Sequence, residues 1–176
     1  MITKTLLVLA ALLVVLLIVA ALRPSAFRVE RSAAVAASPA AVFAHINDVR
    51  QYAKWNPFGK ADPNMTTTFE GPSAGQGAIM TWAGNSQVGE GRLTITESRP
   101  NELVRMKLDF HKPFPSVATA EFTLQPQGNQ TLVTWSLSGN HTYLPRLIGI
   151  FMSMDKMIGG QFERGLTDLK TLAETK

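Results

Sequence analysis

The sequence predicts an α+β fold in which a curved antiparallel sheet wraps around a long C-terminal helix, with one transmembrane helix at the N-terminus. Three observations lead to this prediction. Residues 5–22 form an apolar run without a charged residue. Several later segments alternate between apolar and polar residues, which is the period of half-buried strands. The C-terminal region instead repeats its apolar residues at helical spacing.

The apolar run 5–22 is long enough to cross a bilayer. As a helix it would extend about 27 Å at about 1.5 Å per residue, close to the thickness of the hydrocarbon core. Arg23 and Pro24 end it. A retained anchor is the prediction, because the run is longer than the apolar part of most signal peptides. The small residues Val19, Ala20 and Ala21 leave a cleaved signal peptide as the alternative.

The remainder of the chain has the size of one domain. We expect residues 1–26 to form the anchor and residues 27–176 a single domain large enough to bury a substantial core. The predicted location is a single-pass protein of the cytoplasmic or inner membrane of a bacterium. Basic residues lie on both sides of the apolar run, so the positive-inside rule favours a cytoplasmic domain only slightly and leaves the orientation open.

Strands are predicted at the start of the domain, over residues 27–36, and in the central region. The alternation is clearest where Val104, Met106 and Leu108 oppose Arg105 and Lys107. One apolar and one polar face per strand predicts an antiparallel sheet that is covered on one side. The central strands are expected at residues 65–70, 78–83, 91–97, 103–110, 117–124 and 131–138.

Helices are predicted before and after these strands. Ser38-Pro39 indicates a helix start, because Ser caps free N–H groups and Pro suits the first turn. A short helix is expected there, followed by a second over residues 49–54. A long helix from Pro145 onward is expected to cover the sheet and to leave an interior space for a ligand. Its apolar positions are Leu147, Ile148, Phe151, Ile158, Phe162, Leu166 and Leu169.

Composition excludes several classes of function. The formal net charge is +4, with 17 basic and 13 acidic residues and no basic cluster, so no nucleic-acid partner is expected. The absence of cysteine excludes disulfides, thiolate catalysis and zinc sites built on Cys. His45, His111 and His141 do not have the spacing of metal ligands. Neither a metal nor a cofactor is expected.

A set of motifs runs in order through the domain: Ser38-Pro-Ala-Ala-Val-Phe43, Trp55-Asn-Pro-Phe58, Asp62-Pro63, Gly71-Pro-Ser-Ala-Gly-Gln-Gly77, Trp82-Ala-Gly-Asn85, Val88-Gly-Glu-Gly91, Lys112-Pro-Phe114, Thr134-Trp135, Met154-Asp-Lys-Met-Ile-Gly159 and Phe162-Glu-Arg-Gly-Leu166. This set resembles the START-like (SRPBCC) superfamily, in its polyketide cyclase/dehydrase and lipid-transport branch. The resemblance implies a helix-grip fold. It does not choose a function, because such proteins bind lipids, sterols, polyketides or plant hormones and some are catalytic.

The leading prediction is a membrane-tethered domain that binds a lipid-like or polycyclic molecule in a hydrophobic pocket. Trp82 and Trp135 are favoured as pocket residues because they lie in predicted strands, although either also fits a plain core. The residues expected to line or close the pocket are Trp82, Leu108, Phe110, Phe122, Trp135, Phe151, Met154, Asp155 and Ile158.

Asp155 lies within the apolar stripe of the C-terminal helix. A carboxylate that faces an apolar interior is costly unless it is paired. It is therefore interpreted either as a ligand-orienting or acid–base group, or as the partner of Arg105, Lys107 or a histidine, or as a group that reaches solvent. Gly159-Gly160 in the same helix indicates room for a ligand, a hinge, close packing against the sheet, or a break between two helices.

Two alternatives to a binding domain stay open. One is an enzyme of the polyketide cyclase/dehydratase type, for which Asp155 with a facing Arg or His is the only available acid–base pair. The other is an accessory interaction protein with a vestigial pocket. No catalytic residue is assigned, and the sequence names no protein partner.

Overall fold

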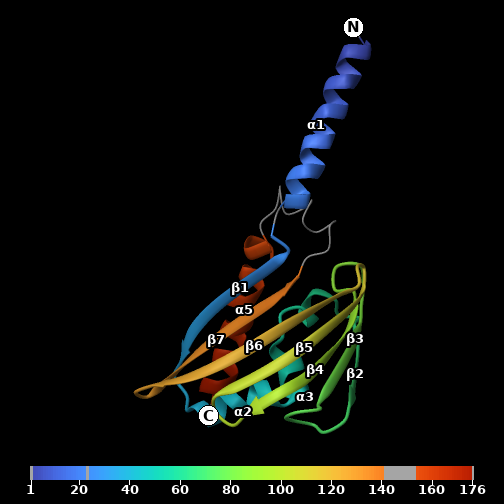
Figure 1. Ribbon diagram of the computed structural model, residues 1–176. Helices are drawn as coiled ribbons and strands as arrows, with labels where there is room; N and C mark the ends of the chain where they lie inside the picture. The colour runs from blue at the N-terminus through green and yellow to red at the C-terminus, as the bar shows by residue number, and fades with distance from the viewer. Residues whose placement is uncertain (1, 23, 141–153, 176) are drawn as a thin grey trace.

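A computed structural model describes residues 2–22, 24–140 and 154–175 of the chain. An N-terminal helix, α1, projects from one end of a domain in which a curved sheet surrounds the C-terminal helix, α5 (Figure 1). The elements are α1 (Ile2–Leu22), β1 (Ala26–Val35), α2 (Pro39–Asn47), α3 (Val49–Trp55), the 3-10 turn η1 (Gly59–Ala61), β2 (Thr66–Glu70), β3 (Ile79–Ala83), β4 (Glu90–Arg99), β5 (Leu103–Lys112), β6 (Ser116–Gln127), β7 (Gln130–Asn140) and α5 (Met154–Glu174).

The seven strands form one antiparallel sheet in the order β1-β7-β6-β5-β4-β3-β2. Consecutive strands from β2 to β7 are neighbours, and β1 joins the sheet beside β7. The α+β fold predicted from the sequence is confirmed. Of the residues predicted to form the covering helix, those from Met154 onward are helical, whereas Leu147, Ile148 and Phe151 lie outside the described residues.

Side-chain caps define the two short helices at one end of the sheet. The Oγ atom of Ser38 accepts a hydrogen bond from the backbone N–H of Ala41, and Pro39 begins α2, as predicted. Asp48 caps α3, because its Oδ1 atom accepts from the backbone N–H groups of Arg50 and Gln51. These caps satisfy amides that helix starts otherwise leave without a partner.

A stack of three aromatic rings joins the sheet to α5. Phe122 on β6 and Trp135 on β7 are register partners, with ring centroids 4.9 Å apart. Phe162 of α5 also stacks on Trp135, with ring centroids 3.9 Å apart and an interplanar angle of 5°. Gly165 permits this approach, because a Cβ atom there would lie 2.8 Å from Cζ3 of Trp135. The buried core is centred on this stack.

Arg31 connects β1 to the beginning of α5. Its guanidinium donates two hydrogen bonds to Asp155, at 2.7 and 2.9 Å, and a third to Oε1 of Glu163 at 2.8 Å. This pairing holds the pKa of Asp155 below its usual range and raises that of Arg31. The side chain of Asp155 is half-exposed, so it does not face the interior. It is an ion-pair partner, as one interpretation held, but of Arg31 rather than of Arg105 or Lys107.

The two glycines of α5 have different surroundings. A Cβ atom on Gly159 would lie 2.1 Å from Nη2 of Arg31, whereas one on Gly160 would meet nothing within 4 Å. Gly159 therefore provides the space in which the Arg31 guanidinium crosses the helix between Asp155 and Glu163. Close packing, one of the interpretations of this pair, explains Gly159. A break between two helices is wrong, because α5 continues through both glycines.

We expect Gly159→Ala to leave the domain less stable than Gly160→Ala does, and Gly160→Ala to stabilise it. The first change displaces Arg31 from its carboxylates. The second removes a flexible residue from an exposed helix position, which contributes about 1 kcal/mol. Urea unfolding of the full chain measures both, and the neighbouring glycine serves as the matched control. Equal effects of the two substitutions would contradict the packing role of Gly159.

The ion pair between Arg31 and Asp155 predicts a stability difference that depends on pH. Because the pKa of Asp155 is lower in the folded chain than in the unfolded chain, the ionised carboxylate stabilises the fold above about pH 4, and this contribution disappears as the pH falls through the lower, folded pKa. The difference in unfolding midpoint between wild type and Asp155→Asn should be present at neutral pH and should shrink in acid. A difference that grows on acidification would be evidence against this pairing.

Candidate ligand-binding site

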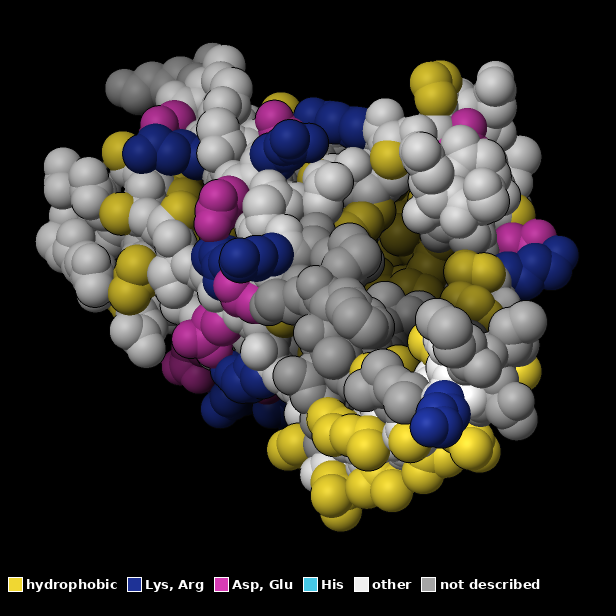
Figure 2. Space-filling view, turned by 90° about the horizontal axis from the view of Figure 1, so that it is seen from above, with side chains coloured by type: hydrophobic (Ala, Val, Ile, Leu, Met, Phe, Trp, Pro, Cys, Tyr) yellow, Lys and Arg dark blue, Asp and Glu magenta, His cyan; other side chains and the backbone are white. Residues whose placement is uncertain are grey.

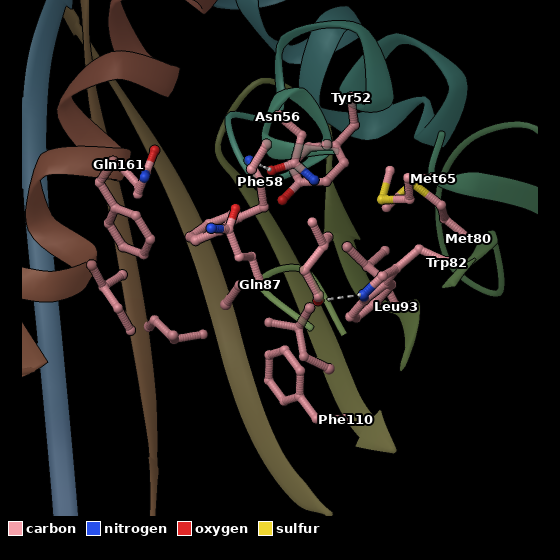
Figure 3. Close-up of a pocket in the computed structure, with 18 of the residues that line it drawn as sticks. Tyr52, Asn56, Phe58, Met65, Met80, Trp82, Gln87, Leu93, Phe110 and Gln161 are labelled. Carbon is pink, nitrogen blue, oxygen red and sulfur yellow. Dashed lines mark hydrogen bonds between the residues drawn. The ribbon is translucent and has the colours of Figure 1, made fainter. Parts of the chain in front are cut away.

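A cavity of about 620 Å³ lies between the inner face of the sheet, α3 and the first half of α5. Its volume falls within the range of small-molecule sites, about 300–1,000 Å³. Figure 3 shows side chains from all of these elements meeting around one space. The lining residues that come from the strands are Met80, Trp82, Leu93, Leu108, Phe110, Lys112, Ala120, Trp135 and Leu137. The others come from helices and loops: Tyr52, Asn56, Phe58, Gly59, Ala61, Met65, Gln87, Val88, Pro113, Ile158, Gln161 and Phe162.

The walls of the cavity are apolar because the inward positions of the strands are apolar. Met80, Leu93 and Leu108 are register partners on β3, β4 and β5, so they form one row across the sheet. Charged residues at the alternate positions point outward. Arg105, for example, pairs with Glu97 and Glu121 on the outer face. This alternation separates a charged outer face from a hydrophobic inner face.

Trp82 forms part of the wall at β3. Its ring lies edge-on to Phe110, with centroids 5.7 Å apart, and its Nε1 atom donates to the carbonyl oxygen of Val88 at 3.3 Å. Gly91 makes this position possible, because a Cβ atom there would lie 2.5 Å from Cζ2 of Trp82 and 2.8 Å from the carbonyl oxygen of Asp109. A residue without a side chain thus positions the largest side chain of this wall.

The cavity contains few polar groups. The uncharged polar side chains are those of Tyr52, Asn56, Gln87 and Gln161. Among the described lining residues, only Lys112 carries a charge. The Nζ atom of Lys112 lies 2.8 Å from Glu90, which neutralises it locally. Burial raises the pKa of the Tyr52 hydroxyl, so this group stays protonated. The site can therefore make hydrogen bonds but holds little net charge.

The cavity opens toward the end of the domain from which α1 projects. Ala26, at the start of β1, pairs with Asn140, and Gly139 pairs with Ala118 near the β5–β6 turn. The turn that contains Pro113 is therefore at the α1 end of the sheet, and so is the β3–β4 loop, because Glu90 pairs with Lys112. Figure 2, seen from that end, shows a hollow with hydrophobic side chains at its bottom. An apolar molecule would enter from this side.

Five of the predicted pocket residues line the cavity: Trp82, Leu108, Phe110, Trp135 and Ile158. Phe122 does not, because Tyr52 and Trp135 cover its ring from two sides. Asp155 does not, because Arg31 holds it at the surface. Phe151 and the side chain of Met154 lie outside the described residues. Contact of any of these residues with a ligand stays a prediction.

The sequence did not predict that α3 and the segment after it contribute to the cavity. Tyr52, Asn56 and Phe58 reach the cavity from there (Figure 3). Gln161 was also missed, although it lies one helical turn after Ile158 and could have been found from the helical period. Within the described residues, no group of three His, Asp or Glu residues is placed to hold a metal ion.

Comparison with known proteins places the chain in a family. A model of the family "Polyketide cyclase / dehydrase and lipid transport" matches residues 26–174. The chain belongs to this family. Because the match covers the sheet and α5 together, the domain with the cavity is the family domain. No curated protein matches the chain significantly.

Solved structures of similar fold come from several bacteria. A protein from Chromobacterium violaceum has 18% identity and a TM-score of 0.61, with 88% of this chain and 100% of that chain covered. The Aha1 dimer from Colwellia psychrerythraea has 19% identity and a TM-score of 0.57, with 84% and 96% covered. A protein from Mesorhizobium loti has 15% identity and a TM-score of 0.60, with 83% and 96% covered. At these identities the likeness shows a shared fold.

The contact between Gly91 and Trp82 generates a prediction. Gly91→Ala should destabilise the domain by about 1–3 kcal/mol, because the added methyl group overlaps both the indole and the backbone of β5. Trp82→Phe removes the overlapping ring atoms, so the double variant should lose less stability than the two single changes together. Urea unfolding of the four proteins gives the coupling. Strict additivity would show that the indole is not what Gly91 accommodates.

Proposed function

We propose that this domain binds a hydrophobic small molecule, lipid-like or polycyclic, in the cavity beside α5, and that α1 holds the domain at a membrane. The observation that carries the proposal is the cavity of about 620 Å³ with apolar walls and an opening at one end of the sheet. The family description, which includes lipid transport, supports the same ligand class.

The properties of α1 support the proposed tether. Residues Lys4–Leu22 form a helix of 19 residues with a mean hydropathy of 3.2, and only 7% of its most apolar window is buried against the rest of the chain. A helix of this kind requires either a bilayer or removal as a signal sequence. Because the cavity opens at the end of the domain that carries α1, a retained anchor would direct the opening toward the bilayer. That arrangement favours a ligand that comes from the membrane.

A binding role fits the cavity better than the enzyme of the cyclase or dehydratase type. General acid–base catalysis needs a titratable pair within reach of the bound molecule. Among the described lining residues there is no Asp, Glu or His, and Asp155 is engaged with Arg31 on the surface. The acid–base pair that the sequence offered for catalysis is therefore not assembled in the described part of the cavity.

Extraction of the purified full chain tests the proposal. We expect organic extracts of detergent-purified protein to contain a hydrophobic compound, identified by mass spectrometry. Ala120→Phe should deplete the compound strongly, since Ala120 is buried on the cavity side of β6 and the phenyl group would fill the space. Thr119→Phe, which adds the same group to the outer face of the same strand, is the matched control and should retain it.

Two results of this experiment would contradict the proposal. An extract of the wild-type chain without any enriched compound would remove the binding role, and so would equal amounts from Ala120→Phe and wild type. The intact mass of the purified protein separately shows whether α1 is retained, which decides the tether.

A further inference from the structure

We propose that Tyr52 and Asn56 form a polar subsite at the inner end of the cavity, which binds one uncharged oxygen, a hydroxyl or a carbonyl, of an otherwise hydrophobic ligand. This inference rests on the proposed binding function and deepens it, because it specifies the chemistry of the ligand and the end that enters first. The pair is called the Tyr52–Asn56 subsite below.

The subsite lies at the end of the cavity opposite the opening. The ring of Tyr52 packs edge-on against Phe122, which pairs with Val104 at the beginning of β5. The opening lies at Lys112 and Pro113, where β5 ends. Figure 3 shows Tyr52 and Asn56 reaching the cavity from the α3 side, next to Phe58. A molecule that enters through the opening therefore brings its leading end to these two side chains.

Both side chains have hydrogen-bonding capacity that the described residues do not use. Tyr52 is 3% exposed and Asn56 is 9% exposed, so neither is open to bulk solvent. The hydroxyl of Tyr52 makes no hydrogen bond within the described part of the chain. Asn56 uses its Oδ1 atom to accept from the backbone N–H of Phe58 at 3.3 Å, which leaves its Nδ2 group as a donor. Neither polar atom is fully enclosed by protein, and both residues line the cavity, so the partner that each lacks can come from a molecule in that space.

The subsite is rigid. Trp55 holds the ring of Tyr52 with its centroid 5.0 Å away, and Phe122 holds it from a second side at 6.3 Å. The backbone N–H of Asn56 donates to the carbonyl oxygen of Tyr52 at 3.0 Å, so the two residues are fixed relative to each other at the end of α3. A polar site that is already ordered loses little conformational entropy when it binds.

The chemistry of the pair selects an uncharged oxygen. A tyrosine O–H and an amide NH₂ both donate, and a carbonyl or hydroxyl oxygen has two lone pairs to accept them. Burial keeps the tyrosine protonated and therefore a donor. An anionic group would need a cation beside it. The one charged lining residue among those described, Lys112, is at the opening and is paired with Glu90.

Two fluorescent probes that differ by one hydroxyl group test the subsite. The full chain in detergent micelles is titrated with 9-anthracenemethanol or with 9-methylanthracene, and binding is followed by energy transfer from the tryptophans in the cavity wall. Tyr52→Phe removes only the hydroxyl. We expect this change to weaken the binding of the alcohol about fivefold, as the loss of one hydrogen bond does, and to leave that of the hydrocarbon unchanged. Partition of the probes into micelles cancels in the comparison.

Two further variants and one stability measurement complete the design. Asn56→Leu removes the NH₂ donors and adds no group that could accept from the hydroxyl of the probe, so it should also weaken the binding of the alcohol selectively. Leu108→Val changes the shape of the apolar wall without removing a polar atom. It should change the affinities for both probes by the same factor. Tyr52→Phe should not lower the melting temperature, because the hydroxyl has no partner among the described residues.

The outcomes separate this inference from the proposed function. If Tyr52→Phe binds both probes as tightly as wild type does, the subsite is overturned and the hydrophobic cavity remains supported. If Tyr52→Phe loses affinity for both probes by the same factor, Tyr52 has a packing role and the subsite is also overturned. Failure of both probes to bind wild type and every variant overturns both proposals.

Discussion

The stacking of Trp135 against Phe162 is the interaction on which the rest of the domain depends. The indole comes from the sheet and the phenyl ring from α5, and Phe122 also stacks on the indole. Buried aromatic side chains of this kind each contribute about 1.5–3 kcal/mol through burial alone. The stack holds the helix inside the curved sheet at one end, and the cavity occupies the space that the helix leaves at the other. Gly165 leaves the space that this stack needs, since a side chain there would collide with both Trp135 and Pro57.

Much of this architecture could be predicted from the sequence, because its signals are local. Alternation along the strands and the Ser38–Pro39 helix start concern neighbours within a few residues. Asp155 shows where such reasoning ends. Its place in the apolar stripe was visible, but its partner Arg31 lies 124 residues earlier in the chain. Alternation also predicts which face of the sheet a residue is on but not whether another side chain covers it. Phe122 was therefore expected in the pocket, although Tyr52 and Trp135 cover its ring. The position of Tyr52 in the cavity wall was missed because α3, with seven residues, is too short to show a helical period.

Charge is distributed so that the inner space stays neutral. On the outer face, Arg105 lies between Glu121 and Glu97. Its hydrogen bond to Glu121 raises its pKa, and the charges of both carboxylates add to this effect. Arg31 and its two carboxylates form a similar group where β1 meets α5. Ion pairs are thus kept where water remains in contact with them, and uncharged amides and a hydroxyl are kept inside. Such an arrangement allows selection by hydrogen bonding without the desolvation cost of a buried charge.

The connection between α1 and β1 is short enough to limit how far the cavity can move from a membrane that holds α1. Only residues 23–25 separate the two elements, which at full extension is about 11 Å of chain. Under the proposed tether, the opening of the cavity would remain within a thin layer above the lipid surface. Encounter with a membrane component then becomes an intramolecular search, governed by an effective concentration rather than by the amount dissolved in water. A modest intrinsic affinity would be sufficient to keep the cavity occupied, and release would be correspondingly fast.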